Sequence, residues 1–316
     1  MRRFLRHLFS IWGPVALLLV SLPALNVWSE TTATPLRHPQ WVPTIKYVED
    51  NFGRHHWVFE ETLTFGPQGR TAWFLKHLWG SFVEGGIDSV SDNAGGFGIK
   101  QALCDKQNLS LLGMFHDFSS NVDELLAGEI KLDSQWSDLV STNLEIAREP
   151  ADTAQAIQSG IHEEYGKLKV QLKPIRRLTF RSTDEVRFLS DDNRHYKTEF
   201  ETAYDLPAVP GLQAVYLFTA ENMVEQKPQY YSPNRVKLHQ AGLAYYAEST
   251  DRWWIWARYL IGHGTERNVP SGLVHAVDTT SSLHLTKDWS LDVSFGWSQS
   301  VTYHSTTTRA GFTYRF

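Results

Sequence analysis

The chain ends with TRAGFTYRF at positions 308–316, and this stretch decides the fold. Apolar and polar residues alternate through it, the apolar set being Ala310, Phe312, Tyr314 and Phe316 and the polar set Arg309, Gly311, Thr313 and Arg315. Successive side chains of a β-strand point to opposite faces of its sheet. The stretch therefore predicts a C-terminal strand with one apolar face and one polar face.

The same alternation recurs upstream. Residues 289–298 alternate large apolar residues with serine, aspartate and glycine, and a tight turn at Lys287–Asp288 joins them to a similar run at 277–286. In 178–188 and 196–206 the polar face is charged. Short turns between alternating segments predict antiparallel strands connected as hairpins.

A soluble sandwich would also alternate, but two features favour a membrane barrel. Aromatic residues lie near the expected strand ends, where a membrane interface favours them; they are Trp253, Trp289, Tyr303 and Tyr314. The terminal Phe316, behind Ala310, Phe312 and Tyr314, resembles the C-terminal signature of bacterial outer-membrane barrels, which their assembly machinery reads. We expect an all-β, transmembrane, antiparallel up-and-down barrel of about 16 strands, with 14 as the alternative.

The N-terminal residues predict export. Three arginines at positions 2, 3 and 6 precede an apolar run at 14–25, and small residues follow up to Ser29, which is the layout of a cleaved signal peptide. We therefore expect three parts: the signal peptide (1–29), a periplasmic tail or small plug (30–51) and the barrel (52–316). The expected location is the outer membrane of a bacterial cell.

Charge and cysteine usage exclude several functions. Removing the signal peptide changes the formal net charge from −5 to −8, because three arginines are lost, and no basic stripe remains for nucleic acid. The single cysteine, Cys104, excludes an intramolecular disulfide and a multi-cysteine metal site. On a strand it is expected to be a small apolar filler. We expect no cofactor.

The charged face of the strands predicts the lining of the lumen. Charges of both signs are costly in lipid and natural around water. The predicted lining residues are Arg181, Glu185, Arg187, Lys197, Glu199, Glu201, Trp254, Trp256, Arg258, Asp292 and Arg309. Two interpretations stay open: the charges pair and hold a closed lumen together, or they line a wet pore in which the aromatic faces stack on sugar rings.

Three segments resemble the C-terminal barrels of bacterial exopolysaccharide-export proteins, namely the poly-N-acetylglucosamine export porin and the cellulose export protein. They are Arg148–Ile161, Val186–Leu206 and Gln229–Tyr246. The family's Ser-Asp-Gly-Asn loop corresponds to 190–193, with Asp192 in place of glycine. Its Tyr-x-Ser-Pro segment corresponds to Tyr231-Ser232-Pro233.

The resemblance implies passive export of a polysaccharide through the barrel. Acidic residues such as Glu185, Glu199 and Glu201 would attract a deacetylated, cationic sugar. The family's tetratricopeptide repeats have no counterpart in 30–51, because one repeat needs about 34 residues. The expected partners are thus outer-membrane lipid, the barrel-assembly machinery, the polysaccharide and a separate periplasmic repeat-containing protein.

Two alternatives belong to other classes. A general diffusion porin would carry a long inward-folded loop, whereas the longest expected loop, 222–235, is modest. A barrel hydrolase would need a rim cluster, and the candidates are His304-Ser305 and Asp191, Asp192 with His195. Neighbouring strand residues face opposite ways, which separates His304 from Ser305. His55, His56 and His77 lack the spacing of a metal site. We expect a protein that is not an enzyme.

Overall fold

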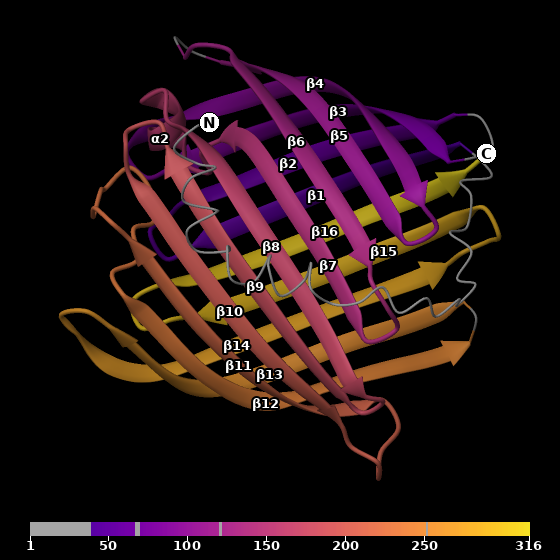
Figure 1. Cartoon of the computed structure of the whole chain (residues 1–316). Helices are drawn as coiled ribbons and strands as arrows, with labels where there is room; N and C mark the ends of the chain where they lie inside the picture. Colours follow the sequence, from indigo (N-terminus) through magenta and orange to yellow (C-terminus); the bar gives the residue numbers. More distant parts are fainter. Residues whose placement is uncertain (1–38, 67–69, 120–121, 251) are drawn as a thin grey trace. The chain divides into compact units, whose positions relative to one another are not determined.

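The computed structural model describes residues 39–316 except 67–69, 120–121 and 251, and in these residues sixteen antiparallel strands form one closed barrel (Figure 1). The predicted fold class and strand number are confirmed. No helix of the described residues is long and apolar enough to cross a membrane. Residues 1–38, which include the predicted signal peptide, lie outside the described part.

The strands follow one another around the barrel in chain order. They are β1 (Gln40–Asp50), β2 (His55–Phe65), β3 (Thr71–Glu84), β4 (Ile87–Cys104), β5 (Gln107–Phe118), β6 (Leu125–Gln135), β7 (Val140–Pro150), β8 (His162–Ile175), β9 (Leu178–Leu189), β10 (Arg194–Asp205), β11 (Leu212–Met223), β12 (Val236–Thr250), β13 (Trp253–Glu266), β14 (Val269–His284), β15 (Trp289–Gln299) and β16 (His304–Arg315). A short helix, α2 (Ala154–Gln158), lies between β7 and β8. We call the end where β1 begins and β16 finishes the turn end, and the opposite end the loop end.

The barrel closes where its first strand meets its last. Ile45 of β1 lies opposite Ala310 of β16, and the neighbouring pairs continue the ladder in both directions. Residues 30–51 were expected to be a tail or plug, and this expectation is wrong from Gln40 onward. The alternation is blurred there because the inner face of β1 carries Val42 and Val48, and Pro43 lacks an amide donor.

The outer face of the barrel is apolar and exposed. Residues directly opposite each other on adjacent strands share a face, so the register carries one inner and one outer set around the whole barrel. Large outer side chains remain 46% exposed at Leu75, 50% at Phe97 and 51% at Leu243. A soluble protein of this kind would bury them, so the exterior matches a hydrocarbon environment.

The predicted interfacial aromatics divide between the two ends. Trp289 and Tyr314 stack with ring centroids 4.5 Å apart at the turn end, where Trp253 also begins its strand. Tyr303 instead belongs to the β15–β16 loop and stacks on Tyr231 at 4.2 Å, inside a cluster of loops. The interfacial prediction is therefore wrong for Tyr303. Cys104 is exposed at the end of β4 and fills no core, contrary to expectation.

Candidate functional site: the lumen and its mouth

The predicted lining residues all lie on the inner face of the barrel. Arg181 is opposite Glu201, and Glu185 is opposite both Lys197 and Lys167. Arg258 of β13 donates to Glu201 of β10 at 2.6 Å, although two strands lie between them. Such a contact reaches across a concave wall, which identifies this face as the lumen side.

The inner side chains of β6 to β10 form what we call the charged wall, and Arg187 is its centre. Arg187 forms ion pairs with Glu163 and with Glu185, the latter at 2.5 Å, and lies 3.7 Å from Glu149. Lys167 Nζ is 3.0 Å from the other oxygen of Glu185. Removing Arg187 would leave the buried Glu163 without its ion-pair partner and the buried Glu185 with Lys167 alone.

The other predicted charges of this wall are paired as well. Arg181 and Arg258 both bind Glu201, and Lys197 Nζ is 3.0 Å from Glu199 Oε1. The first interpretation, that the lumen charges pair and hold the structure, therefore applies to the charged wall. Its carboxylates are engaged by cations of the same protein, which weakens their attraction for a passing cation.

The inner side chains of β14 to β16 form a different surface, which we call the hydroxyl wall. Its small hydroxyl residues are Thr280, Ser282, Ser290, Ser294, Ser298, Ser305, Thr307 and Thr313. Asp292 and Arg309 point into the lumen from the same wall, are exposed, and form no ion pair within the described part of the chain. Small side chains leave lumen space beside this wall, whereas the long charged ones fill it.

A cavity of about 390 Å³ lies along the hydroxyl wall. On its β13 side, the Arg258 guanidinium lies 5.5 Å from the centre of the Trp256 ring and donates to Asp278 Oδ2 at 2.7 Å. Trp254 shares the inner face of the same strand. An aromatic ring beside fixed polar groups and a row of hydroxyls provides both stacking and hydrogen bonding for a sugar.

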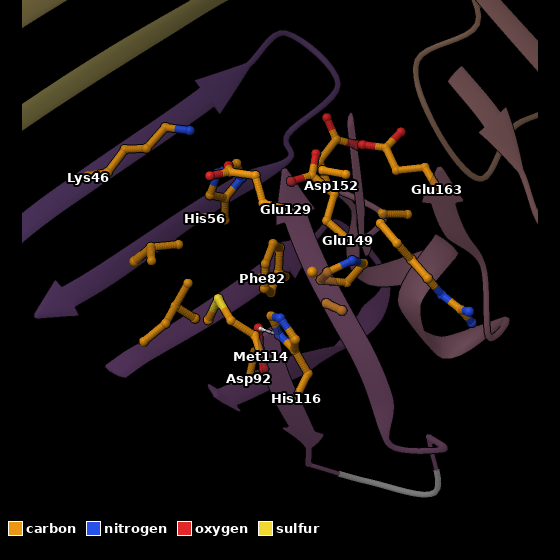
Figure 2. Close-up of a pocket in the computed structure, with 18 of the residues that line it drawn as sticks. Lys46, His56, Phe82, Asp92, Met114, His116, Glu129, Glu149, Asp152 and Glu163 are labelled. Atoms are coloured by element: carbon orange, nitrogen blue, oxygen red, sulfur yellow. Dashed lines mark hydrogen bonds and ion pairs between the residues drawn. The ribbon is translucent and has the colours of Figure 1, made fainter. Parts of the chain in front are cut away.

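A second cavity, of about 430 Å³, lies near the loop end (Figure 2). Lys46 and His56 line it from β1 and β2, while Glu149, Asp152 and Glu163 line it from the opposite side. At its base His116 Nδ1 lies 2.8 Å from the buried Asp92. Carboxylates thus gather around Arg187 on one side of this cavity, and Lys46 and His56 lie on the other.

The β7–β8 loop folds inward over this cavity. Thr153 caps α2 by accepting a hydrogen bond from the Ala156 amide at 3.2 Å. Ala154 and Ile157 then pack against Phe82, Val90, Phe118 and Leu125 on the inner wall. Burial of this apolar side keeps the loop inside the mouth.

The β11–β12 loop folds inward too and meets the first. Thr153 Oγ1 donates to the Gln229 carbonyl at 2.5 Å, and Tyr230 is buried with Ala156 and Met223. Tyr231 stacks on Tyr303 beside it. The loop at 222–235 is modest in length, but it folds inward: two short loops join over the lumen and narrow its mouth.

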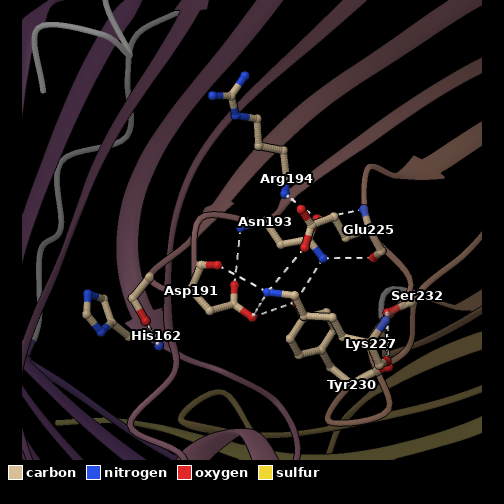
Figure 3. Close-up of polar contacts among 9 residues, drawn as sticks. His162, Asp191, Asn193, Arg194, Glu225, Lys227, Tyr230 and Ser232 are labelled. Carbon is tan, nitrogen blue, oxygen red and sulfur yellow. Dashed lines mark hydrogen bonds and ion pairs between the residues drawn. The ribbon is translucent and has the colours of Figure 1, made fainter.

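A polar latch holds the second loop to the β9–β10 turn (Figure 3), and we define it as Asp191, Asn193, Lys227 and Tyr230. Asp191 Oδ2 accepts from Lys227 Nζ at 2.8 Å and from the Tyr230 hydroxyl at 2.9 Å. Asn193 Nδ2 donates to the same hydroxyl at 2.9 Å. The turn and the loop are thus tied by both charge and hydrogen bonds.

The latch shifts the ionisation of its members. Burial opposes charge on Asp191, but hydrogen bonds from Lys227 and Tyr230 outweigh it and lower the pKa of this carboxyl. The hydrogen bond to Asp191 raises the pKa of Lys227. Burial and Asp191 raise the pKa of Tyr230 to about 12, although the Asn193 contact opposes this. All three groups thus favour the closed arrangement at neutral pH.

The latch also explains the segments singled out in the sequence. Residues 190–193 form the turn, and residues 231–233 lie in the loop that it holds. Asp192 adopts φ = 68°, a left-handed conformation in which glycine is the least strained residue. This accounts physically for a motif with glycine at that position.

The hydrolase candidates are not assembled into a catalytic group. His304 and Ser305 are adjacent in β16 and face opposite sides. His195 Nε2 lies 2.8 Å from Glu221, while Asp191 is held in the latch and Asp192 is exposed. His77 binds Asn93, and no group suited to a metal ion occurs among the described residues.

Several residues of the mouth escaped the sequence analysis. Asp152, Lys46, Lys227 and the α2 loop carry no alternation that would mark them. One signal for α2 was present in the sequence: Thr153 precedes a short run of residues that favour helix, and threonine is a preferred N-cap residue. A five-residue helix is too short for that signal to stand out in a sequence.

Comparison with known proteins supports the fold. No family model matches the chain, and no curated protein matches it. A solved structure described as a bacterial polysaccharide outer membrane secretin is similar with a TM-score of 0.72 and 12% identity, over 88% of this chain and 98% of that one. CdiB from Acinetobacter baumannii is similar with a TM-score of 0.51 and 7% identity, over 88% of this chain and 60% of that one. At such identities the shared property is the barrel fold.

Proposed function

We propose that the chain is a channel of the bacterial outer membrane through which a polysaccharide leaves the cell. The observation that carries this proposal is the hydroxyl wall beside Trp256, a continuous small polar surface with an aromatic ring along an otherwise ion-paired lumen. The apolar exterior suits a membrane. The likeness to a polysaccharide secretin barrel over nearly its whole length adds support.

In this proposal the two walls have separate tasks. The charged wall stiffens the barrel through its ion pairs, and the glycan moves along the hydroxyl wall, exchanging hydrogen bonds with successive serine and threonine side chains. Trp256 offers a stacking face, and Arg258 is held by Glu201 and Asp278 so that it stays beside the ring. Many weak contacts allow a polymer to slide, because each one is released cheaply.

Export would be passive and the two inward loops would have to move. No nucleotide-binding loop occurs in the sequence, so synthesis elsewhere must drive the polymer. A separate periplasmic protein with repeats would deliver it. The outward row of Ala310, Phe312, Tyr314 and Phe316 would be read by the barrel-assembly machinery, and no step requires the chain to be an enzyme.

The experiment is single-channel recording of the mature chain in a planar bilayer with soluble glycan fragments added on one side. We expect a stable conductance that the fragments block. Trp256→Ala should weaken the block by about tenfold or less, since a stacking contact contributes about 1 kcal/mol. Trp253→Ala, on the outer face, is the matched control and should leave the block unchanged. Equal block in both variants, or none in the native protein, would contradict the proposal.

The second candidate function is a general diffusion porin, because two inward-folded loops narrow the lumen as porin loops do. A porin would pass small sugars and ions alike without a block by longer glycans. Liposome swelling with mono- and oligosaccharides distinguishes the two. Size-limited entry without block favours the porin.

The electrostatic component is tested separately. Replacing Glu185, Glu199 and Glu201 by glutamine should lower the flux of a cationic glycan, but only modestly, because each carboxylate already faces a cation of the barrel. If the flux of the cationic glycan is unchanged while the folded barrel is present in the native amount, the electrostatic attraction is rejected. The proposal that the glycan moves along the hydroxyl wall would still stand.

A further inference from the structure

The outer face of β2 to β4 carries polar side chains inside the apolar belt. Glu61 and His77 lie directly opposite each other, with Glu61 Oε2 3.8 Å from His77 Nδ1. Their side chains are 36% and 51% exposed. His77 Nε2 lies 3.0 Å from Asn93 Oδ1, so the ring is held in place by its neighbour. We call Glu61, His77, Asn93 and Gly95 the belt patch.

The belt patch lies at the level of the hydrocarbon. The outward residues that flank Glu61 along β2 are Phe59 and Leu63, and those that flank His77 along β3 are Leu75 and Trp79. Acyl chains offer no hydrogen bonds and no solvation to a carboxylate or an imidazole. An exposed acid and base at this depth therefore call for a polypeptide beside them.

A second lipid-facing acid shows what a self-sufficient site looks like. Asp184 of β9 accepts hydrogen bonds from Ser182 at 3.0 Å and from Thr198 at 2.8 Å, so its own barrel satisfies it. Among the described residues, the charged or polar neighbour recorded for Glu61 is the ring of His77, at 3.8 Å and thus beyond hydrogen-bond distance. The carboxylate of Asp184 is therefore hydrogen-bonded within its own barrel, whereas that of Glu61 still lacks a hydrogen-bond donor in the described part of the chain.

Glycines leave room for close approach next to the acid and base. Gly95 is directly opposite His77, and Gly113 follows on β5. A Cβ added at either position would meet nothing within 4 Å, so the packing of this barrel does not require glycine there. On the outer face Gly95 lies opposite Phe115 and Gly113 lies opposite Phe97, and small residues are what membrane-embedded surfaces use for tight contact.

We infer that a second copy of the chain covers the belt patch and that the barrel is a two-fold dimer. A two-fold axis along the membrane normal, placed between β2 and β3, puts Glu61 of each copy at the depth of His77 of the other. The patch is then complementary to itself, as an isologous interface requires. Nε2–H is donated to Asn93, so Nδ1 is the nitrogen that faces a carboxylate, and it donates there when the ring carries its second proton.

Charge exchange tests the inference on the full mature chain in lipid bilayers, with subunits counted by single-molecule photobleaching. We expect the native chain to form dimers and Glu61→His and His77→Glu each to be monomeric alone. Mixing the two variants should restore dimers that contain one copy of each, because every contact again joins an acid to a base. Asp184→Leu is the matched control and should dimerise normally.

A cross-link locates the interface independently. In a Cys104→Ser background, a short thiol-reactive cross-linker should join Leu63→Cys chains to Leu75→Cys chains, because these two positions lie opposite each other on the two sides of the axis. Leu243→Cys, which faces lipid on β12, should not be cross-linked. Circular dichroism checks that each variant is folded. A native chain that stays monomeric at high protein-to-lipid ratio overturns the inference. Dimers that survive both charge variants, or cross-linking of Leu243→Cys but not of the Leu63→Cys and Leu75→Cys mixture, overturn it as well.

Discussion

The charged wall and the hydroxyl wall face each other across the lumen and use opposite chemistry. In the charged wall, long side chains extend to each other, and Arg187 alone touches three carboxylates. In the hydroxyl wall, most side chains are short, and Asp292 and Arg309 stay exposed and unpaired within the described residues. The difference teaches that inward-facing charge by itself does not mark a solute path. A solute path needs polar groups that are not already paired within the protein and can therefore bind the solute.

The largest expected effect separates the walls by stability. Arg187→Leu should lower the free energy of unfolding by about 3 kcal/mol or more, because the buried Glu163 would lose its ion-pair partner and the buried Glu185 would keep only Lys167. Arg309→Leu in the hydroxyl wall should change it by about 0.5 kcal/mol or less. Urea unfolding in lipid vesicles, followed by tryptophan fluorescence, measures both. Similar losses in the two variants would erase the distinction.

The second-largest expected effect distinguishes the charged wall from the hydroxyl wall by single-channel conductance. Gly296→Trp should strongly reduce single-channel current, since a Cβ there meets only Asp278 at 3.5 Å and the ring would project into the open cavity. Thr183→Trp, at the same inward parity within the charged wall, should reduce it less because that side is already filled. A greater loss of current for Thr183→Trp than for Gly296→Trp would show that ions pass along the charged wall, which contradicts the proposal.

The latch decides whether either wall is reached from the loop end. Lys227→Met should raise the open probability a few-fold, because a solvent-accessible ion pair contributes at most about 1 kcal/mol. Arg235→Met, in the same connection but outside the latch, is the matched control. Conductance records of equal open probability for both variants would show that other loop contacts hold the mouth closed.

The pH dependence of the native mouth follows from the same groups. Asp191 has a lowered pKa, so its contribution is present above the ordinary aspartate range, near 3.9, and is lost as pH falls through the lowered value. Lys227 has a raised pKa, so its contribution is present below the ordinary lysine value and is lost as pH rises through the raised one. Open probability should be constant from about pH 5 to 9 and increase toward both extremes. A transition near neutral pH would contradict this.

The smallest expected effect concerns ion selectivity. Arg309→Glu should move the reversal potential toward cation preference, because an unpaired lumen charge acts directly on permeating ions. Asp292→Asn should move it the opposite way. Both variants should keep the native unfolding free energy within about 0.5 kcal/mol. A destabilised barrel would mean that these charges have structural partners after all.

Much of the architecture was contained in the sequence by itself. Alternation with a period of two is a local property, and it predicted the closed barrel, the number of strands and the inner face of Arg181, Trp256 and the other lining residues. It failed at β1, where Val42 and Val48 make the inner face look like the outer one. It also could not reveal Glu61 and His77 as a pair, because alternation says nothing about which strands meet.

Only the tertiary structure decided which charges are paired, where the loops lie and which acids remain without a partner. Arg258 reaches Glu201 over two intervening strands, and Asp191 meets Lys227 from another hairpin. These contacts depend on register and on the curvature of the closed sheet. The physical reason is that the face of a side chain follows from its own strand, whereas its partner is set by segments distant in the chain.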